Sequence, residues 1–162
     1  MNLYILRHAD ADKRDEDKYT DDNLRPLVKK GKNKTERIAK FLKKRKNKVA
    51  LILTSPAERC LEAAKIIRKD LKLQKEQLVK LDCLLPEGSN ADLIAEIKEK
   101  YMVDSLLVVG HDPNLSLLIS QLLTGTLELP IDLKKGGLCK LSVDELIDGK
   151  CARLEILLTP NF

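Results

Sequence analysis

The sequence is poor in aromatic residues: it has no tryptophan, two phenylalanines and three tyrosines among 162 residues. Proteins that bind single-stranded nucleic acid stack the bases on aromatic side chains, and this chain has too few for such a surface. No apolar run approaches the ~20 residues that a membrane-spanning helix needs. We therefore expect neither a nucleic acid nor a membrane among the partners.

The cysteines form no cluster. Cys60, Cys83, Cys139 and Cys151 are scattered, and no Cys-x-x-Cys pair of the kind found in zinc sites and redox motifs occurs. The chain opens directly on an apolar segment, with no leader of the type that directs export. We therefore expect free thiols and a protein of the reducing cytoplasm.

Three common signatures of phosphate and ester chemistry are also missing. There is no Gly-x-x-x-x-Gly-Lys loop, which excludes a P-loop enzyme. No cysteine is followed by an arginine six positions later, which excludes the usual loop of cysteine-dependent phosphatases. No Gly-x-Ser-x-Gly elbow is present, which excludes the usual α/β-hydrolase nucleophile.

Apolar runs and amphipathic segments alternate along the chain. We expect strands near residues 2–6, 49–53, 78–81 and 105–109, helices near residues 24–45, 57–70, 90–100 and 114–123, and two final strands at 137–143 and 152–158. This alternation predicts an α/β fold with a doubly wound, mostly parallel central sheet. Helices should cover both faces, and the last two strands should form an antiparallel edge hairpin near the C-terminus. We expect a single domain over residues 1–162.

Positive charge is concentrated in one segment. Residues 29–48 hold eleven Lys or Arg and one acidic residue, a net of +10, whereas the whole chain carries +5. The apolar residues of this region, at helical spacing, are Leu27, Ile38, Phe41 and Leu42. A solvated amphipathic helix is the simpler interpretation, because charge runs are usually exposed faces. A docking face for an acidic partner, or weak contact with nucleic acid, is the alternative.

Arg7 and His8 stand where the first predicted strand ends. Ligands of open α/β sheets bind outside the carboxyl ends of the strands. An Arg-His pair there suits phosphate, because Arg grips oxygens in a fork and His can attack or transfer a proton. Arg59 follows the second predicted strand after Thr-Ser-Pro, and His111, the other histidine of the chain, follows the strand at 105–109. If these strands are parallel neighbours, the four side chains converge on one rim.

Two metal-dependent sites are the competing interpretations. Asp10 and Asp12 follow the first strand, as the Asp-x-Asp pair of haloacid-dehalogenase-type phosphatases does with magnesium, but Arg14 stands where Thr or Val is needed. His8 and His111 could bind zinc with a nearby aspartate, but two arginines in the same site would repel a dication. We therefore expect no metal and no other cofactor.

Taken in order, these segments resemble the histidine phosphatase (phosphoglycerate-mutase-like) superfamily. Residues 6–11 (Leu-Arg-His-Ala-Asp-Ala) are similar to its Arg-His-Gly signature. Residues 55–64 are similar to its second phosphate-binding arginine segment, and residues 109–113 to its second histidine motif. Residues 24–27, with Gly31 close behind, match the segment that precedes the first helix. The order and spacing agree over nearly the whole chain.

The chain is short between the arginine segment and the second histidine, where larger members carry long insertions. In this it resembles the minimal branch, the SixA-like phosphohistidine phosphatases, which remove phosphate from phosphorylated histidine on signalling proteins. Asp10 and residues 114–116 (Asn-Leu-Ser) are typical of that branch. Ala9 replaces the commoner Gly, and Glu62-Ala63 replaces a Gln-Thr pair, so details of the pocket differ. The resemblance implies a metal-independent hydrolase whose partner is a phosphorylated protein of the histidine-phosphotransfer type.

The resemblance also implies a role for each residue of the rim. His8 is the nucleophile and forms a phosphohistidine intermediate, while Arg7, Arg59 and His111 hold the phosphoryl oxygens. Attack needs a neutral imidazole, and two guanidinium groups nearby disfavour imidazolium.

The sequence does not decide which residue donates a proton to the leaving group. Glu87, in a Leu-Pro-Glu-Gly turn, lies about where larger relatives carry an acidic residue, and an ordinary turn carboxylate fits the position equally well. Asp10 is the next candidate, and a leaving imidazole, which protonates near neutrality, needs little help. Two other functions also stay open: hydrolysis of a small phosphorylated metabolite, and non-catalytic binding of a phosphoprotein. The residues leave the oligomeric state open as well.

Overall fold

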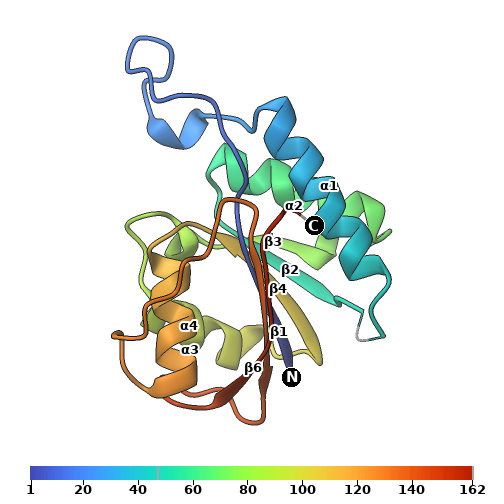
Figure 1. Ribbon diagram of the computed structural model, residues 1–162, viewed down its shortest axis with the longest axis vertical. Coiled ribbons are helices and arrows are strands. Elements are labelled where there is room, and N and C mark those ends of the chain that lie inside the picture. The colour runs from blue at the N-terminus through green and yellow to red at the C-terminus, as the bar shows by residue number, and fades with distance from the viewer. Residues whose placement is uncertain (47, 162) are drawn as a thin grey trace.

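The computed structural model, which describes residues 1–46 and 48–161, is built around one six-stranded sheet in the order β3-β2-β4-β1-β5-β6 (Figure 1). The strands are β1 (Asn2–Arg7), β2 (Leu51–Thr54), β3 (Leu78–Lys80), β4 (Ser105–Gly110), β5 (Leu138–Val143) and β6 (Ala152–Leu158). β1 to β4 are parallel to one another. β5 runs antiparallel to β1 and pairs with β6 as the edge hairpin.

Helices cover both faces of the sheet (Figure 1). The α-helices are α1 (Lys29–Lys43), α2 (Glu58–Asp70), α3 (Asn90–Lys100) and α4 (Asn114–Thr124), and the short 3-10 helices are Asp22–Leu24, Lys75–Gln77 and Asp82–Leu84. α1 and α2 pack on one face, and α3 and α4 pack on the other. The predicted doubly wound α/β fold with an antiparallel edge hairpin is confirmed.

Each central strand supplies side chains to both layers of the core. Leu3 and Ile5 of β1 face the layer of α3 and α4, whereas Tyr4 and Leu6 face the layer of α1 and α2. All six residues of β4 are buried, which is typical of a parallel strand with both faces covered. The strands at the centre of the sheet are therefore rigidly held, and their ends are good places for a precise site.

The register of the parallel strands brings three loops to one edge. Arg7 at the end of β1 is level with Gly110 at the end of β4. The backbone N–H of His8 continues this pairing by donating to the Gly110 carbonyl at 3.1 Å, and Ser55 N–H donates to the Val109 carbonyl at 3.0 Å. The first residues beyond β1, β2 and β4 therefore lie side by side.

The first helix begins later than the sequence predicts. The expected start near Leu24 is wrong, because Leu24 ends a short 3-10 helix and α1 begins at Lys29. Arg25 is extended, as a residue before proline prefers to be. Leu27 then forms an isolated antiparallel bridge with Ala11. The segment predicted as the first helical turn is instead a short extended strap beside the loop that follows β1.

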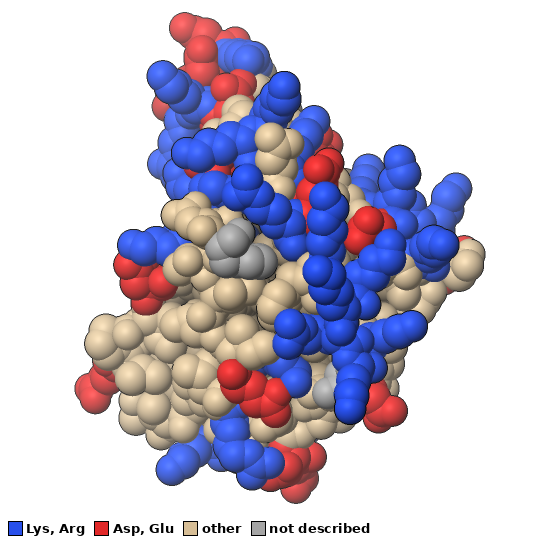
Figure 2. Space-filling view, turned by 45° about the vertical axis from the view of Figure 1, so that its right-hand side comes forward, with Lys and Arg blue, Asp and Glu red and all other residues tan. Residues whose placement is uncertain are grey.

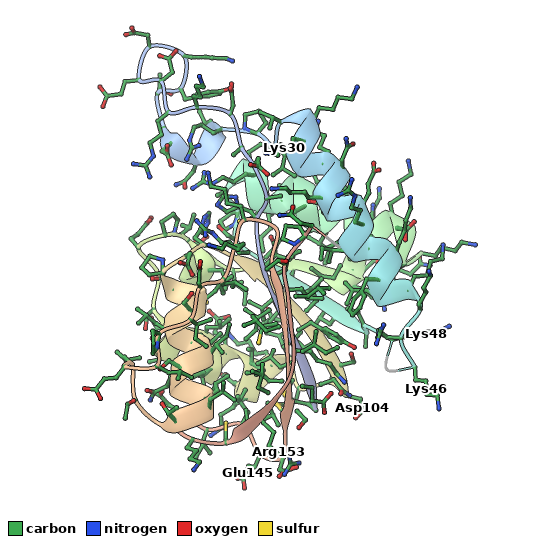
Figure 3. All side chains as sticks on the ribbon, viewed as in Figure 1. Lys30, Lys46, Lys48, Asp104, Glu145 and Arg153 are labelled. Atoms are coloured by element: carbon green, nitrogen blue, oxygen red, sulfur yellow. The ribbon has the colours of Figure 1, made fainter. Side chains whose placement is uncertain are left out.

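The basic segment is an amphipathic helix followed by a short connection. Ile38 and Leu42 of α1 are buried against α2 and the sheet, and Phe41 is half-buried. The lysines of the opposite side form a band of positive charge over this part of the surface (Figure 2). Figure 3 places Lys30 at the end of α1 near the loops and Lys46 beyond the other end. Residue 47 of this segment lies outside the described residues.

Two further expectations can be compared with the structure. All four cysteines are free thiols, as the sequence predicts. Among the described residues, no helix combines the length and apolar character needed to cross a membrane.

Gly31 allows α1 to approach the loop after β1 closely. A Cβ at this position would lie 2.1 Å from the carbonyl oxygen of Asp10. The same carbonyl accepts a hydrogen bond from the N–H of Val28 at 3.0 Å, so it cannot move away freely. Glycine at this position therefore couples the start of α1 to the segment that carries His8.

We expect Gly31→Ala to lower the free energy of unfolding by about 1–3 kcal/mol, the usual cost of inserting a methyl group into a packed region. This outcome opposes helix propensity, since alanine is the better helix former by about 1 kcal/mol. Urea unfolding measures the change. Asn33→Ala, on the exposed side of the same helix, is the matched control and should not destabilise. An unchanged urea midpoint for Gly31→Ala would contradict the close approach.

Candidate active site

Arg7, His8, Arg59 and His111 line one cavity of about 450 Å³ at the carboxyl edge of the sheet. Arg7 ends β1, and His8 and His111 directly follow β1 and β4. Arg59 lies in the first turn of α2, which begins soon after β2. The structure thus brings together the four side chains that the sequence places at strand ends. The cavity combines two imidazoles with two guanidinium groups.

A single hydrogen bond fixes the tautomer of His8. Its Nδ1 lies 2.8 Å from the carbonyl oxygen of Ala9, and because a carbonyl only accepts, Nδ1 carries the proton. Nε2 of the neutral ring therefore keeps a lone pair, which accepts from Nε of Arg59 at 3.3 Å. The ring therefore presents an unprotonated nitrogen, Nε2, to the guanidinium of Arg59.

The neutral form of His8 is favoured by its surroundings. Burial, opposed by the hydrogen bond to Ala9 and assisted by the positive charges of Arg59 and Arg7, lowers the pKa of His8 from 6.5 to about 4. At neutral pH the imidazole is therefore uncharged and able to act as a nucleophile.

Arg59 connects the parts of the site. Its side chain is 4% exposed. Nη1 donates to the backbone carbonyl of Asp22 at 2.9 Å, and Nη2 lies 3.4 Å from the Asp22 carboxylate. Nη2 also donates to Nδ1 of His111 at 3.4 Å. One guanidinium therefore holds both histidine rings and the loop that contains Asp22.

His111 is held in the opposite tautomer. Its Nδ1 accepts from Arg59, so Nε2 carries the proton and donates to the Ser55 hydroxyl at 2.9 Å. The ring centre lies 5.2 Å from that of His8. Burial first, then the nearby His8 and Arg59, lower the pKa of His111 from 6.5 to about 3. The ring is neutral when no anion occupies the cavity.

Cys60 packs against His111 beneath the cavity. Its sulfur lies 3.5 Å from Nε2 of that ring, and the side chain is fully buried. Burial raises the pKa of the Cys60 thiol to about 12. The cysteine therefore remains a neutral thiol and serves as packing, because a thiolate is needed for nucleophilic chemistry.

Arg7 is held by one hydrogen bond and has one buried donor without a partner among the described residues. Its Nη1 donates to the Leu133 carbonyl at 2.9 Å. Its Nε is buried and has no hydrogen-bond partner within the part of the chain that the structure describes. Buried donors almost always have a partner, so this atom is an exception within the site.

The two carboxylates of the Asp-x-Asp segment are both engaged elsewhere. Asp10 forms a 2.7 Å ion pair with Lys34 of α1. Asp12 accepts from Lys18 at 2.7 Å and from the hydroxyl of Tyr19. The described residues contain no group of three His, Cys, Asp or Glu side chains arranged to hold a metal.

Glu87 occupies a different place from the four central residues. Its neighbour Pro86 lines the cavity, whereas Glu87 lines a separate hollow together with Asp92 and Glu99. Its role as a proton donor stays a prediction.

Sequence reasoning did not identify several residues that shape the cavity. Asp22 and Arg25 lie in the charged loop and the strap, where no periodic pattern marks them, and Lys135 comes from a distant loop. Ser55 carried the clearest signal, because it directly follows a strand in the segment that contains Arg59.

Comparison with known proteins places this site in a family. The profile of the histidine phosphatase superfamily (branch 1) matches residues 3–82, the part that contains Arg7, His8 and Arg59. The chain belongs to the histidine phosphatase superfamily. An uncharacterized protein of Picosynechococcus sp. is 31% identical to it over 143 residues, which cover 87% of this chain and 84% of that protein.

Solved structures agree with this assignment over almost the full length. The protein histidine phosphatase SixA complexed with tungstate is similar with a TM-score of 0.81 and 27% identity, over 99% of this chain and 97% of the other. A protein assigned as the phosphohistidine phosphatase SixA of Agrobacterium tumefaciens gives a TM-score of 0.80 and 25% identity, over 98% and 97% of the two chains. The expected resemblance to the SixA branch is confirmed.

Other phosphatases share the fold alone. The α-ribazole phosphatase of Shigella flexneri has a TM-score of 0.71 at 18% identity, over 99% of this chain and 97% of that one. A mycobacterial glucosyl-3-phosphoglycerate phosphatase has a TM-score of 0.67 at 15% identity, over 96% and 97%. The same fold therefore occurs in phosphatases that act on different kinds of substrate.

The two lowered histidine pKa values predict how stability depends on pH. In the unfolded chain both imidazoles bind protons below about pH 6.5. In the folded protein His8 and His111 stay neutral until the pH approaches about 4 and about 3. The unfolded state therefore binds more protons in this window, and the free energy of unfolding falls as the pH is lowered.

We expect the free energy of unfolding of the wild type to fall between about pH 6.5 and about pH 5, with a slope reduced by about half in His111→Asn. Urea unfolding at several pH values measures both slopes. Equal slopes for the two proteins would mean that His111 titrates normally in the folded state.

Proposed function

We propose that this histidine phosphatase removes phosphate from phosphorylated histidine on a signalling protein, through a phospho-His8 intermediate. The observation that carries the proposal is the neutral His8, whose Nε2 lone pair faces the guanidinium of Arg59 in a cavity also lined by Arg7 and His111. Similarity to the protein histidine phosphatase SixA over 99% of the chain supports this substrate class.

In the first step, the lone pair of His8 Nε2 attacks the phosphorus of the substrate. The nitrogen–phosphorus bond of the substrate breaks, and its electron pair stays on the leaving imidazole, which takes up a proton from solvent. The hydrogen bond that His8 Nδ1 donates to the Ala9 carbonyl orients the ring for attack. It also stabilises the positive charge that develops on the ring.

The remaining polar side chains stabilise the transferred group. Arg59 and Arg7 neutralise the negative charge spread over the phosphoryl oxygens. Burial first, and then His8 and Arg59, lower the pKa of His111, and the negative charge of a phosphoryl dianion acts in the opposite direction and raises it. Once it is protonated on Nδ1, the ring no longer accepts from Arg59, and Nδ1 donates to a phosphoryl oxygen while Nε2 keeps its hydrogen bond to Ser55.

In the second step, water attacks the phosphorus of phospho-His8. The nitrogen–phosphorus bond breaks, its electron pair returns to Nε2, and inorganic phosphate leaves while a proton of the water passes to solvent. Arginines supply the positive charge, so the reaction proceeds without a metal. The engagement of Asp10 and Asp12 by lysines supports this part of the proposal.

We expect acid-labile phosphoryl label on His8 after rapid quench with a labelled phosphohistidine peptide, because the intermediate is a phosphoramidate. His8→Ala should carry no label and should lose turnover to the background rate. A chelator should change neither result, and tungstate, which is bound in the SixA structure, should inhibit. Near-normal turnover by His8→Ala, or restoration of chelated protein by magnesium, would contradict the mechanism.

Leaving-group chemistry separates phosphohistidine from metabolite substrates. An alkoxide must be protonated as it departs, whereas imidazole is a weaker base and needs less help. We therefore expect Glu87→Gln to leave hydrolysis of a phosphohistidine peptide nearly intact and to depress any hydrolysis of an alkyl phosphate. Glu99→Gln, in the same hollow, is the matched control.

The same measurement decides between the substrate classes. Equal losses on both substrates would make Glu87 structural, and no loss on either would remove it from the reaction. Alkyl-phosphate turnover by the wild type that exceeds phosphohistidine turnover would overturn the proposal in favour of a small-metabolite phosphatase. Binding of phosphohistidine peptide without turnover would indicate a non-catalytic module.

A further inference from the structure

Three exposed cations lie at the cavity in addition to the four central residues. Lys13 and Arg14 come from the loop after β1, and Lys135 comes from the turn before β5. We name these three residues the cationic collar. Their side chains are exposed, so they are available to a molecule that approaches the cavity from solvent.

Two carboxylates of the cavity, Asp12 and Asp112, form no ion pair with the collar. Asp12 is engaged by Lys18 and Tyr19, and the Asp112 carboxylate accepts from the Ser116 hydroxyl. Within the part of the chain that the structure describes, neither Lys13 nor Lys135 forms a salt bridge.

Arg14 is only weakly paired. Asp22 accepts from Nε and Nη2 of Arg25 at 2.7 and 3.1 Å and also contacts Arg59. Its contact with Arg14 is 3.7 Å long, and the Arg14 side chain is 84% exposed. Apart from this long contact, the collar therefore forms no ion pair among the described residues.

The backbone holds Lys135 next to His8. The N–H of Gly136 donates to the carbonyls of Arg7 and His8, at 3.1 and 3.2 Å. Gly136 adopts a positive φ of 75°, a conformation that glycine adopts readily. The Arg7 N–H in turn donates to the Gly137 carbonyl at 3.1 Å. The position of Lys135 is therefore set by the same backbone that carries the candidate nucleophile.

The other part of the collar is anchored through Asp12. The N–H of Asp12 donates to the Pro26 carbonyl at 2.9 Å, and its own carbonyl accepts from Nη1 of Arg25 at 2.6 Å. Lys13 and Arg14 follow directly. Both parts of the collar thus have a hydrogen-bonded backbone and exposed charged tips, as expected for groups that contact a ligand from outside.

Electrostatics indicates what the collar binds. A single phosphoryl dianion is balanced by Arg7 and Arg59, so the collar remains as unbalanced like charge around the same opening. Like charges at one opening repel one another and attract further anions. The exposed charged ends of Lys13, Arg14 and Lys135 come from two distant segments. Such an arrangement suits several carboxylates on the surface of another protein better than one small ligand enclosed in the cavity.

We propose that the cationic collar binds Asp and Glu side chains that flank the phosphorylated histidine, so that the substrate is an acidic segment of protein. This inference rests on the proposed function and adds the chemical class of its substrate. Lys13, Arg14 and Lys135 are then specificity residues that select substrates before the phosphoryl group is transferred.

The test compares two phosphohistidine peptides that differ only in their flanks, one with Asp and Glu and the other with Asn and Gln. We expect the wild type to prefer the acidic peptide by about tenfold in kcat/KM at low ionic strength. The preference should disappear near 1 M salt, where the Debye length is about 3 Å.

Collar variants should reduce this preference. Lys13→Gln and Lys135→Gln should each lower the ratio of the two kcat/KM values by about two- to fivefold, the range for exposed charge pairs, and the double variant should lower it further. Lys135→Arg keeps the charge and should restore the ratio. Lys98→Gln, at an exposed position of α3 away from the cavity, should keep the wild-type ratio.

Each alternative outcome has its own meaning. Equal kcat/KM for the two peptides, or a ratio in Lys13→Gln and Lys135→Gln equal to that of Lys98→Gln, overturns the collar but leaves the proposed function standing. Failure of the wild type to hydrolyse either peptide overturns the proposed function. Competitive inhibition by pyrophosphate far stronger than by phosphate, lost in Lys135→Gln while peptide flanks have no effect, assigns the collar to a second phosphate and overturns the protein substrate.

Discussion

The parallel pairing of β1, β4 and β2 is the constraint on which the rest of the molecule depends. The pairing sets the ends of these strands level, so that His8, Ser55 and His111 become neighbours although they are distant in sequence. β4 is buried on both faces, which excludes water and leaves its backbone no alternative partners. A shift of one residue in register would turn every side chain to the opposite face and would disperse the cavity.

Arg59 links the aligned segments through its positive charge and its hydrogen bonds. Its guanidinium touches both imidazoles and the loop that contains Asp22. Burial first, and then the positive charge of Arg59, make protonation of the two rings costly, which keeps both rings neutral near pH 7. In the proposed mechanism, a bound phosphoryl group opposes the electrostatic part of this effect at His111, which would couple occupation of the cavity to protonation of that ring.

Much of the fold could be predicted from local patterns, and the exceptions are informative. The strands, the four helices and the final hairpin follow from the alternation of apolar runs with amphipathic segments. The predicted start of the first helix near Leu24 was wrong, because the apolar residues of the strap before α1 also suit a helical turn. Its extended path depends on Pro26 and on pairing of Leu27 with Ala11, a contact that residue patterns do not reveal.

The sequence by itself determined the fold class, the superfamily and the four polar residues at or shortly after the strand ends, because these follow from residue types at short, ordered spacings. Only the tertiary structure decided which nitrogen of each ring carries the proton and how far burial lowers each pKa. It also decided that Asp10 is engaged by Lys34 and that Lys135 lies beside the opening. These properties depend on distances between segments far apart in the chain, and no local pattern of residues specifies such distances.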